Sequence, residues 1–126
     1  MTPAPSFGLS AIGQIGFGVG DIGRAVAFYR DVLGLKLLLE APRMGIFDCG
    51  GIRLMLGLAE VEREASGSIL YFKVADIEQA VRTLESRGLA FERQPHLVAR
   101  MPDHELWMAL FRDPDGNALA LMCEKR

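Results

Sequence analysis

The sequence has few of the features that mark secreted, membrane-spanning or nucleic-acid-binding proteins. Its 126 residues include two cysteines, Cys49 and Cys123, which form no Cys-x-x-Cys motif, so no disulfide scaffold is expected and a reduced, cytoplasmic protein is favoured. No apolar run reaches the roughly 18 residues of a membrane span, and the opening MTPAPSFG lacks the pattern of a secretory signal. The net charge of −2 argues against nucleic acid and anionic membranes as partners.

The chain has an ordinary globular composition, with 50% hydrophobic and 24% charged residues. Its length suits one compact domain.

One stretch raises the question of a nucleotide site. Gly18, Gly20 and Gly23 form a Gly-x-Gly-x-x-Gly motif between an apolar run and a helix-like run. Glu40 follows about 20 residues after the middle glycine, where a dinucleotide-binding fold has a ribose-binding acid.

Hydrophobic periodicity predicts a strand, a helix, a strand and a hairpin in the first half of the chain. Asp21 is a good N-cap for the helix, and Gly34 is placed to end it. The Gly50-Gly51 pair supplies the positive φ angles of a two-residue hairpin turn. The expected elements are a strand at 12–19, a helix at 22–33, a strand at 35–40 and a hairpin at 44–58.

The chain contains an internal repeat, and this repeat weighs against a nucleotide site. VGDIGRAV (19–26) matches VADIEQAV (74–81) at an offset of 55 residues, and GGIRLML (50–56) matches DGNALAL (115–121) at an offset of 65. Two copies of strand–helix–strand–strand–strand follow from these matches. In the second copy the positions of the three glycines hold Lys73, Ala75 and Glu78. The glycine motif is therefore interpreted as a closely packed turn and not as a phosphate cradle.

The second copy predicts a strand, a helix capped by Asp76 and another strand within 68–93, followed by a hairpin at 106–124. The polar, proline-containing connection QPHLVARMPDHE (94–105) has no full counterpart in the first copy and holds both histidines, His96 and His104. A long connection of this kind beside a binding site is a candidate lid.

Four stretches carry a resemblance to a known superfamily: VGDIGRAVAFYRDVLGL, FDCGGIRLML, YFKVADIEQAV and FRDPDGNALAL. They resemble the vicinal oxygen chelate superfamily, which includes glyoxalase I, bleomycin-resistance proteins, fosfomycin-resistance enzymes and extradiol dioxygenases. The resemblance implies a homodimer and an α+β fold, in which two tandem βαβββ modules form curled mixed sheets around a cup. The expected organisation is a flexible N-terminal arm (1–11) and a single domain (12–126) made of module one (12–58), a linker (59–67) and module two (68–126).

The same resemblance gives a prediction about metal binding. Metal-dependent members of the superfamily take ligands from the first and last strands of each module, which correspond here to Gln14, Met55, Ile69 and Ala120. Gln14 is compatible with a metal, whereas the other three side chains cannot hold a hard or borderline divalent cation. We therefore predict no metal and no other cofactor. The glyoxalase and dioxygenase activities, which depend on the metal, are not carried over.

The expected function is the binding of a small hydrophobic or aromatic compound in the cup, in the manner of bleomycin-resistance proteins, without catalysis. Side chains alternate along a strand, so Arg53 shares a face with Met55, and the hairpin turn pairs Asp48 with Arg53. A cross-strand ion pair is the favoured interpretation of that pairing. Trp107 either stacks on the ligand or anchors the second hairpin. The candidate ligand-binding residues are Gln14, Asp48, Arg53, Met55, Tyr71, His96, His104 and Trp107.

Two other functions stay open. One is a metal-dependent lyase, isomerase or dioxygenase in which His96, His104 and Glu105 replace the missing ligands. The other is a structural or regulatory dimer with a vestigial cup. The metal content of the purified protein separates the first of these from a binding protein.

Overall fold

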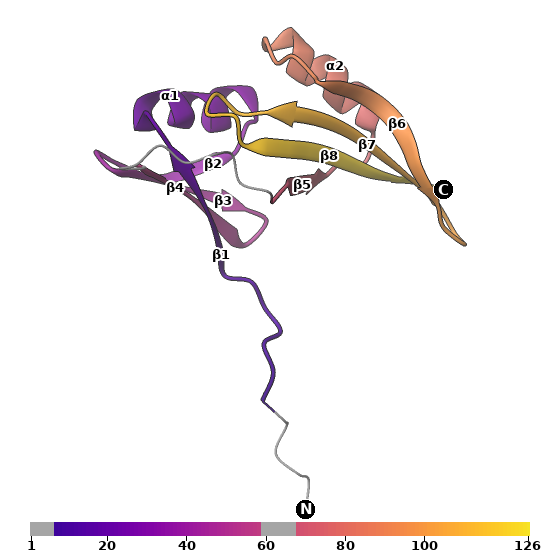
Figure 1. Cartoon of the computed structure of the whole chain (residues 1–126), viewed down its shortest axis with the longest axis horizontal. Coiled ribbons are helices and arrows are strands. Elements are labelled where there is room, and N and C mark those ends of the chain that lie inside the picture. Colours follow the sequence, from indigo (N-terminus) through magenta and orange to yellow (C-terminus); the bar gives the residue numbers. More distant parts are fainter. Residues whose placement is uncertain (1–6, 59–67) are drawn as a thin grey trace, which may run out of the picture.

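The computed structural model describes residues 7–58 and 68–126, and it contains the two βαβββ modules expected from the sequence (Figure 1). Residues 1–6 of the expected arm and the whole expected linker, 59–67, lie outside the described residues. Within the described ranges, no helix is long and apolar enough to cross a membrane.

Module one is a helix packed on a four-stranded mixed sheet. Its strands lie in the order β1-β4-β3-β2, with β1 parallel to β4 and the other pairs antiparallel. The last turn of the helix is π-helical, with the Leu33 N–H donating to the Phe28 carbonyl at 3.0 Å. The elements are β1 (Gln14–Val19), α1 (Ile22–Ala27), the π-helix η1 (Phe28–Val32), β2 (Lys36–Ala41), β3 (Met44–Cys49) and β4 (Ile52–Leu58).

Module two repeats this architecture. Its strands lie in the order β5-β8-β7-β6, with β5 parallel to β8, so the parallel pair again joins the first and last strands of the module. The elements are β5 (Leu70–Lys73), α2 (Ile77–Ser86), β6 (Arg93–Arg100), β7 (Glu105–Arg112) and β8 (Ala118–Lys125).

The local signals in the sequence act as predicted. Asp21 and Asp76 cap α1 and α2 by accepting hydrogen bonds, each at 3.0 Å, from backbone N–H groups three residues further along. Gly34 follows η1 with a φ of 79°, and Gly50 and Gly51 form the β3–β4 turn with φ angles of 62° and 91°. These positive angles are easily adopted only by glycine, so both turns are encoded locally.

The segment 94–105, predicted as a loop and a candidate lid, is mostly strand, and that prediction is wrong. Residues 93–100 form β6, which pairs antiparallel with β7. The strand expected within 89–93 does not form, because Leu89 is buried and Phe91 packs on Phe111 before the chain joins the sheet. β6 is the edge strand of its sheet, where Pro95 and charged side chains are tolerated, and this disguises it as a connection.

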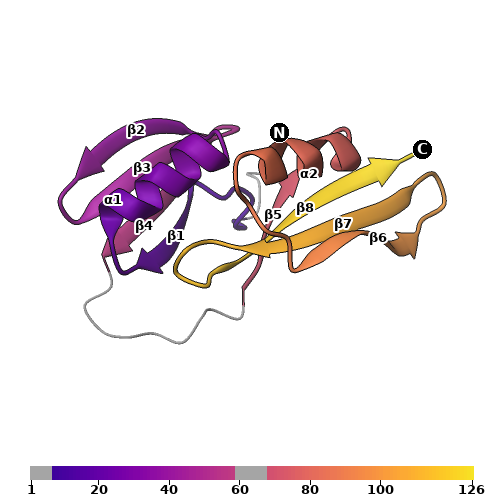
Figure 2. The ribbon, with the colours of Figure 1, turned by 90° about the horizontal axis from the view of Figure 1, so that it is seen from above.

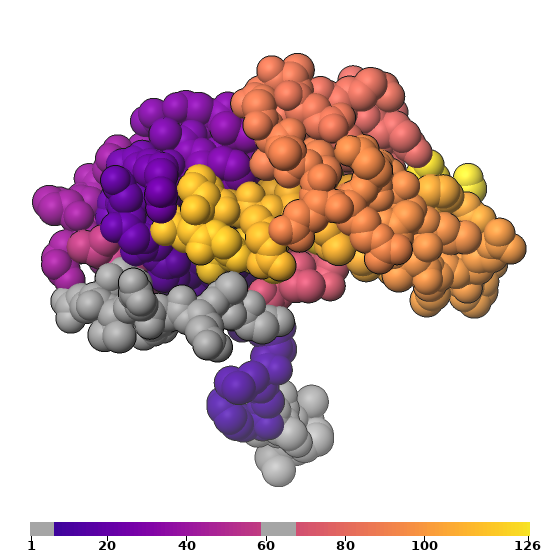
Figure 3. Space-filling model, turned by 45° about the horizontal axis from the view of Figure 1, so that its top comes forward, coloured from indigo at the N-terminus to yellow at the C-terminus, as the bar shows by residue number. Residues whose placement is uncertain are grey.

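The two modules lie side by side with α1 and α2 on the same side of the molecule (Figure 1). Figure 3 shows that the segment joining β7 to β8, near the yellow end of the colour scale, lies against the indigo and purple part of module one. One cluster of buried side chains extends through both modules and includes Tyr29, Phe47, Phe111 and Leu119. The helices cover one face of each sheet, and no helix of the described part of the chain lies over the opposite faces.

Candidate functional site

The uncovered face of module one carries four of the predicted site residues: Gln14, Asp48, Arg53 and Met55. Along β1, Ile15, Phe17 and Val19 pack toward the core, so Gln14 lies on the opposite face. Gln14 is the register partner of Arg53 on β4. Met55 lies two residues further along β4, on the same face.

Gln14 and Met55 are in direct contact. The Gln14 Nε2 donates to the Met55 sulfur at 3.6 Å. A thioether is a weak acceptor, so this contact leaves most of the hydrogen-bonding capacity of the exposed Gln14 amide for other partners. Gly16 is the register partner of Met55, and a Cβ there would lie 3.7 Å from the Met55 methyl carbon. Because Gly16 has no side chain, it leaves space beside the Met55 side chain on this face.

The uncovered face of module two carries Tyr71. Tyr71 on β5 is exposed and is the register partner of Ala120 on β8. Ala120 is completely buried among its neighbours, and Ile69, which directly precedes β5, is 39% exposed. Neither of these two positions supplies a donor atom from its side chain.

Arg53 and Tyr71 line one cavity of about 270 Å³ between the β3–β4 hairpin and β5. Lys73 and Cys49 also line it, so two cations and a phenol from different modules converge there. Burial, together with the neighbouring Asp48 carboxylate, raises the pKa of the Cys49 thiol. The thiol therefore stays protonated near neutral pH, which argues against a nucleophilic role.

Asp48 and Arg53 are register partners, as predicted, but the expected ion pair between them does not form within the described chain. The Asp48 carboxylate instead accepts a hydrogen bond from the Gly51 N–H at 3.2 Å, which closes the hairpin turn. Asp48 is thus committed to the turn, and the Arg53 guanidinium is left facing the cavity.

The two histidines lie at different levels of the β6–β7 hairpin. His96 opposes Met108 in the sheet, and its Nδ1 lies 2.9 Å from the Gln94 carbonyl oxygen. His104 lies in the turn, with its Nδ1 2.7 Å from a carboxylate oxygen of Asp103. This hydrogen bond lowers the pKa of Asp103.

Trp107 lies on the helix-facing side of its sheet. It is the register partner of the buried Cys123 and packs against the core. Its Nε1 donates to Glu105 at 3.2 Å, and the Lys125 ammonium lies 4.3 Å from the ring centre. Trp107 therefore faces away from Tyr71 and Gln14, in the position of an anchor for the second hairpin.

The side chains present do not fit a divalent metal. Of the four positions at which the superfamily resemblance would place ligands, only Gln14 offers a donor that suits such an ion. His96, His104 and Glu105 are not brought together. Over residues 7–58 and 68–126, no group of three or more histidine, cysteine, aspartate or glutamate side chains is arranged to hold a metal ion.

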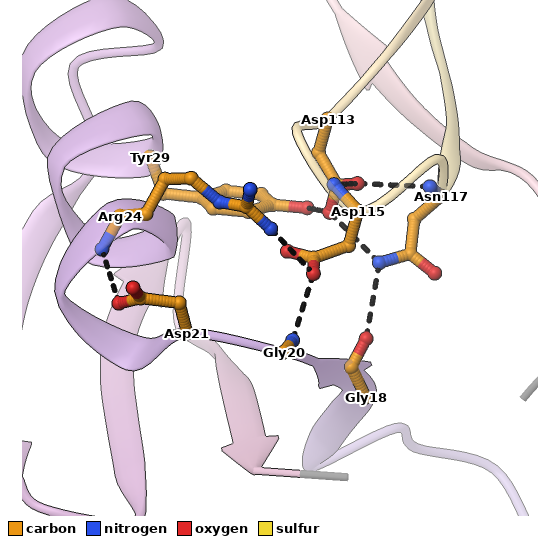
Figure 4. A network of polar contacts seen from close by, with 8 residues as sticks. All are labelled: Gly18, Gly20, Asp21, Arg24, Tyr29, Asp113, Asp115 and Asn117. Atoms are coloured by element: carbon orange, nitrogen blue, oxygen red, sulfur yellow. Dashed lines mark hydrogen bonds and ion pairs between the residues drawn. The ribbon is translucent and has the colours of Figure 1, made fainter. Parts of the chain in front are cut away.

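A polar network that the sequence did not reveal joins the two modules (Figure 4). The Tyr29 hydroxyl donates to Asp113 at 2.8 Å, and the Asn117 side-chain amide donates to the same carboxylate oxygen at 2.8 Å and to the Gly18 carbonyl at 3.3 Å. Burial, followed by the charge of Asp113, raises the pKa of Tyr29 far above its usual value. The phenol is therefore protonated throughout the neutral range.

Asp115 makes the second half of this network. One of its carboxylate oxygens accepts from the Gly20 N–H at 2.7 Å and from the Arg24 guanidinium at 3.0 Å. The segment 113–117, which lies within the hairpin predicted at 106–124, thus fixes the end of β1 and the start of α1 to module two. The network holds β1 in place through the Gly18 carbonyl, and the hydrogen bonds that form it do not involve the Gln14 side chain.

Comparison with known proteins identifies relatives of the chain. A family model described as the Glyoxalase/Bleomycin resistance protein/Dioxygenase superfamily matches residues 11–121. The Bacillus subtilis (strain 168) protein YraH is 31% identical over 126 aligned positions, covering 86% of this chain and 94% of YraH.

Solved structures show the same fold. Lactoylglutathione lyase from Agrobacterium tumefaciens is 25% identical with a TM-score of 0.72, covering 90% of this chain and 93% of the lyase. A putative glyoxalase family protein from Bacillus anthracis has a TM-score of 0.77 at 19% identity, covering 96% of this chain and all of the other (100%). At that identity the second likeness concerns the fold alone.

Proposed function

Because the chain belongs to the glyoxalase/bleomycin resistance protein/dioxygenase superfamily, we propose that it is a binding protein for a small hydrophobic or aromatic molecule and that it works without the divalent metal used by many of its relatives. The observation that carries this proposal is the side-chain chemistry at the four expected ligand positions. Met55, Ile69 and Ala120 replace donors with apolar groups on the uncovered faces. Apolar walls with a few convergent polar groups suit an organic ligand.

Arg53 supports a ligand that also carries an acidic group. Its guanidinium lines the cavity beside Tyr71 and Lys73 and has no side-chain partner in the described part of the chain. Lys73 has only a distant partner, with its ammonium 3.8 Å from Glu124. An aromatic carboxylate would place its ring on the apolar side chains that line this cavity, such as Ile52 and Leu70, and its charge on Arg53, where a bidentate contact is available.

We further propose that the cup is completed in a homodimer. Exposed apolar side chains occur on β2 and beside or within β5: Leu38, Leu39, Ile69 and Tyr71 are 39% to 49% exposed. Within one chain the modules are joined through the helix-bearing side and the 113–117 segment, which leaves these residues open to a second copy. Sedimentation or light scattering of the full chain tests this point, with a mass of about one chain contradicting it.

Two alternatives remain distinct from this proposal. The Agrobacterium relative is named a lyase, but a metal-dependent lyase requires donors that three of the four positions lack. A dimer with a vestigial cup requires that no ligand bind there, and the cavity beside Arg53 argues against it.

Metal analysis and a ligand screen test the proposal together. Elemental analysis of untagged protein is expected to find well under one equivalent of zinc, nickel, iron or manganese per chain. A thermal-shift screen is expected to find aromatic carboxylates that stabilise the protein. For such a ligand, Arg53→Gln should weaken binding at least roughly tenfold, the usual effect of losing a charge-assisted hydrogen bond.

Arg82→Gln is the matched control, because Arg82 is an exposed arginine on α2 that does not line the cavity. Its affinity for the same ligand should match the wild type. One metal equivalent per chain, or equal losses in both variants, would overturn the proposal.

A further inference from the structure

A second cavity lies on the helix-bearing side of the molecule and shares only Phe72 among its lining residues with the cavity beside Arg53. Its volume is about 420 Å³, and it lies between the end of η1 and α2, which Figure 2 shows side by side. Leu33 and Leu35 line it from module one. Ala80 and Thr83 line it from α2, and Phe111 is one of the sheet residues beneath it.

A contact between the two modules lies near the cavity. The Arg87 guanidinium, at the C-terminal end of α2, donates to the Val32 carbonyl at 2.9 Å. This bond fixes the end of α2 to the end of η1, while the 113–117 network fixes the modules at a second point. Protein interiors are packed about as densely as organic crystals. An apolar space of this size beside a pinned helix therefore has the character of a binding site.

The polar groups at this cavity select against anions. Asp76, Gln79 and Thr83 are its polar or charged lining residues, and among residues 7–58 and 68–126 no lysine, arginine or histidine lines it. Asp76 already uses one oxygen to cap α2. The cup differs in this respect, because Arg53 and Lys73 line the cavity there. The two sites therefore prefer ligands of different charge.

We infer that the cavity between η1 and α2 is a second ligand site, which takes an uncharged, largely apolar molecule with a hydrogen-bonding group for Gln79 or Thr83. Its volume lies within the roughly 300–1,000 Å³ range of small-molecule pockets. Because both modules supply the walls, a ligand there bridges them and stabilises their packing. This inference does not rest on the proposed function of the cup.

Titration of the full chain with Nile red, a neutral apolar fluorophore, tests the site. Thr83→Trp fills the cavity from α2, whereas Arg82→Trp adds the same ring on a neighbouring helix position outside the lining. We expect Thr83→Trp to weaken Nile red binding by about tenfold or more, equivalent to about 1.4 kcal/mol. Arg82→Trp should bind the dye as the wild type does.

Unchanged dye affinity in Thr83→Trp, or an equal loss in Arg82→Trp, would overturn the inference. If only the cup variant Arg53→Gln lost Nile red binding, the dye would be bound in the cup, and the inference would also be overturned. Circular dichroism verifies folding, and Ala80→Leu replaces Thr83→Trp where the larger ring prevents it. A dimer that Thr83→Trp dissociates and Arg82→Trp does not would identify this face as a protein interface, which is a further contradicting outcome.

Discussion

Replacing Tyr29 by phenylalanine removes a single oxygen from the junction between the modules. Tyr29 is completely buried, and its hydroxyl donates to Asp113 at 2.8 Å. A hydrogen bond to a charged group contributes roughly 1.5–3 kcal/mol. Asn117 still donates to the same oxygen after the substitution, so we expect a loss near the lower part of this range, about 2 kcal/mol. For a chain of this size that lowers the Tm by roughly 8 °C.

Urea denaturation of the full chain measures this loss, with circular dichroism as the signal. Tyr71→Phe is the matched control, because it removes the same atom from the only other tyrosine, which is exposed. The control is expected to change the free energy of unfolding by less than about 0.5 kcal/mol. If both substitutions lowered the free energy of unfolding equally, the view that the Tyr29–Asp113 bond joins the modules would be refuted. It would also be refuted if neither substitution changed that free energy.

Three further predictions concern pH, packing and metal. Folding raises the pKa of Tyr29 above its ordinary value of 10.0. The stability that the protonated phenol contributes is therefore complete below pH 10 and is lost as the pH rises further. The free energy of unfolding should decline more steeply at alkaline pH in the wild type than in Tyr29→Phe. Gly45→Ala would put a Cβ 2.9 Å from a Val26 methyl group, whereas Gly57→Ala meets nothing within 4 Å; we expect a loss of about 1–3 kcal/mol in the first and little change in the second, measured by the same denaturation. The double variant Met55→Glu and Ile69→His supplies two metal ligands in addition to Gln14. Calorimetry should detect zinc binding to this variant and not to the wild type. If the variant does not bind zinc, the proposed cup is contradicted.

Much of the fold could be predicted from the sequence, because its signals are local. Asp21 and Asp76 cap helices through their own backbone neighbours, and the positive φ angles of Gly50 and Gly51 set the first hairpin. The repeat then predicted two copies of strand–helix–strand–strand–strand, whereas the order of the strands within each sheet came from the structure. The alternation that placed Arg53 and Met55 on one face follows from the two-residue period of a strand.

The errors and omissions concern partners distant in the chain. β6 was mistaken for a loop because an edge strand needs only one neighbour and tolerates proline and charge. The side of the sheet on which Trp107 lies depended on the register of β7 with β8, which a one-residue shift would reverse.

By itself, the sequence determined the two modules, their turns and caps, and the apolar chemistry of three of the four expected ligand positions. Only the tertiary structure decided that Tyr29 meets Asp113 across 84 positions of sequence, that the histidines stay apart, and that two cavities with different charged linings adjoin at Phe72. The physical reason is that caps and turns are satisfied within a few residues. Junctions and cavities instead arise only when separate modules pack, and no local preference specifies how their surfaces meet.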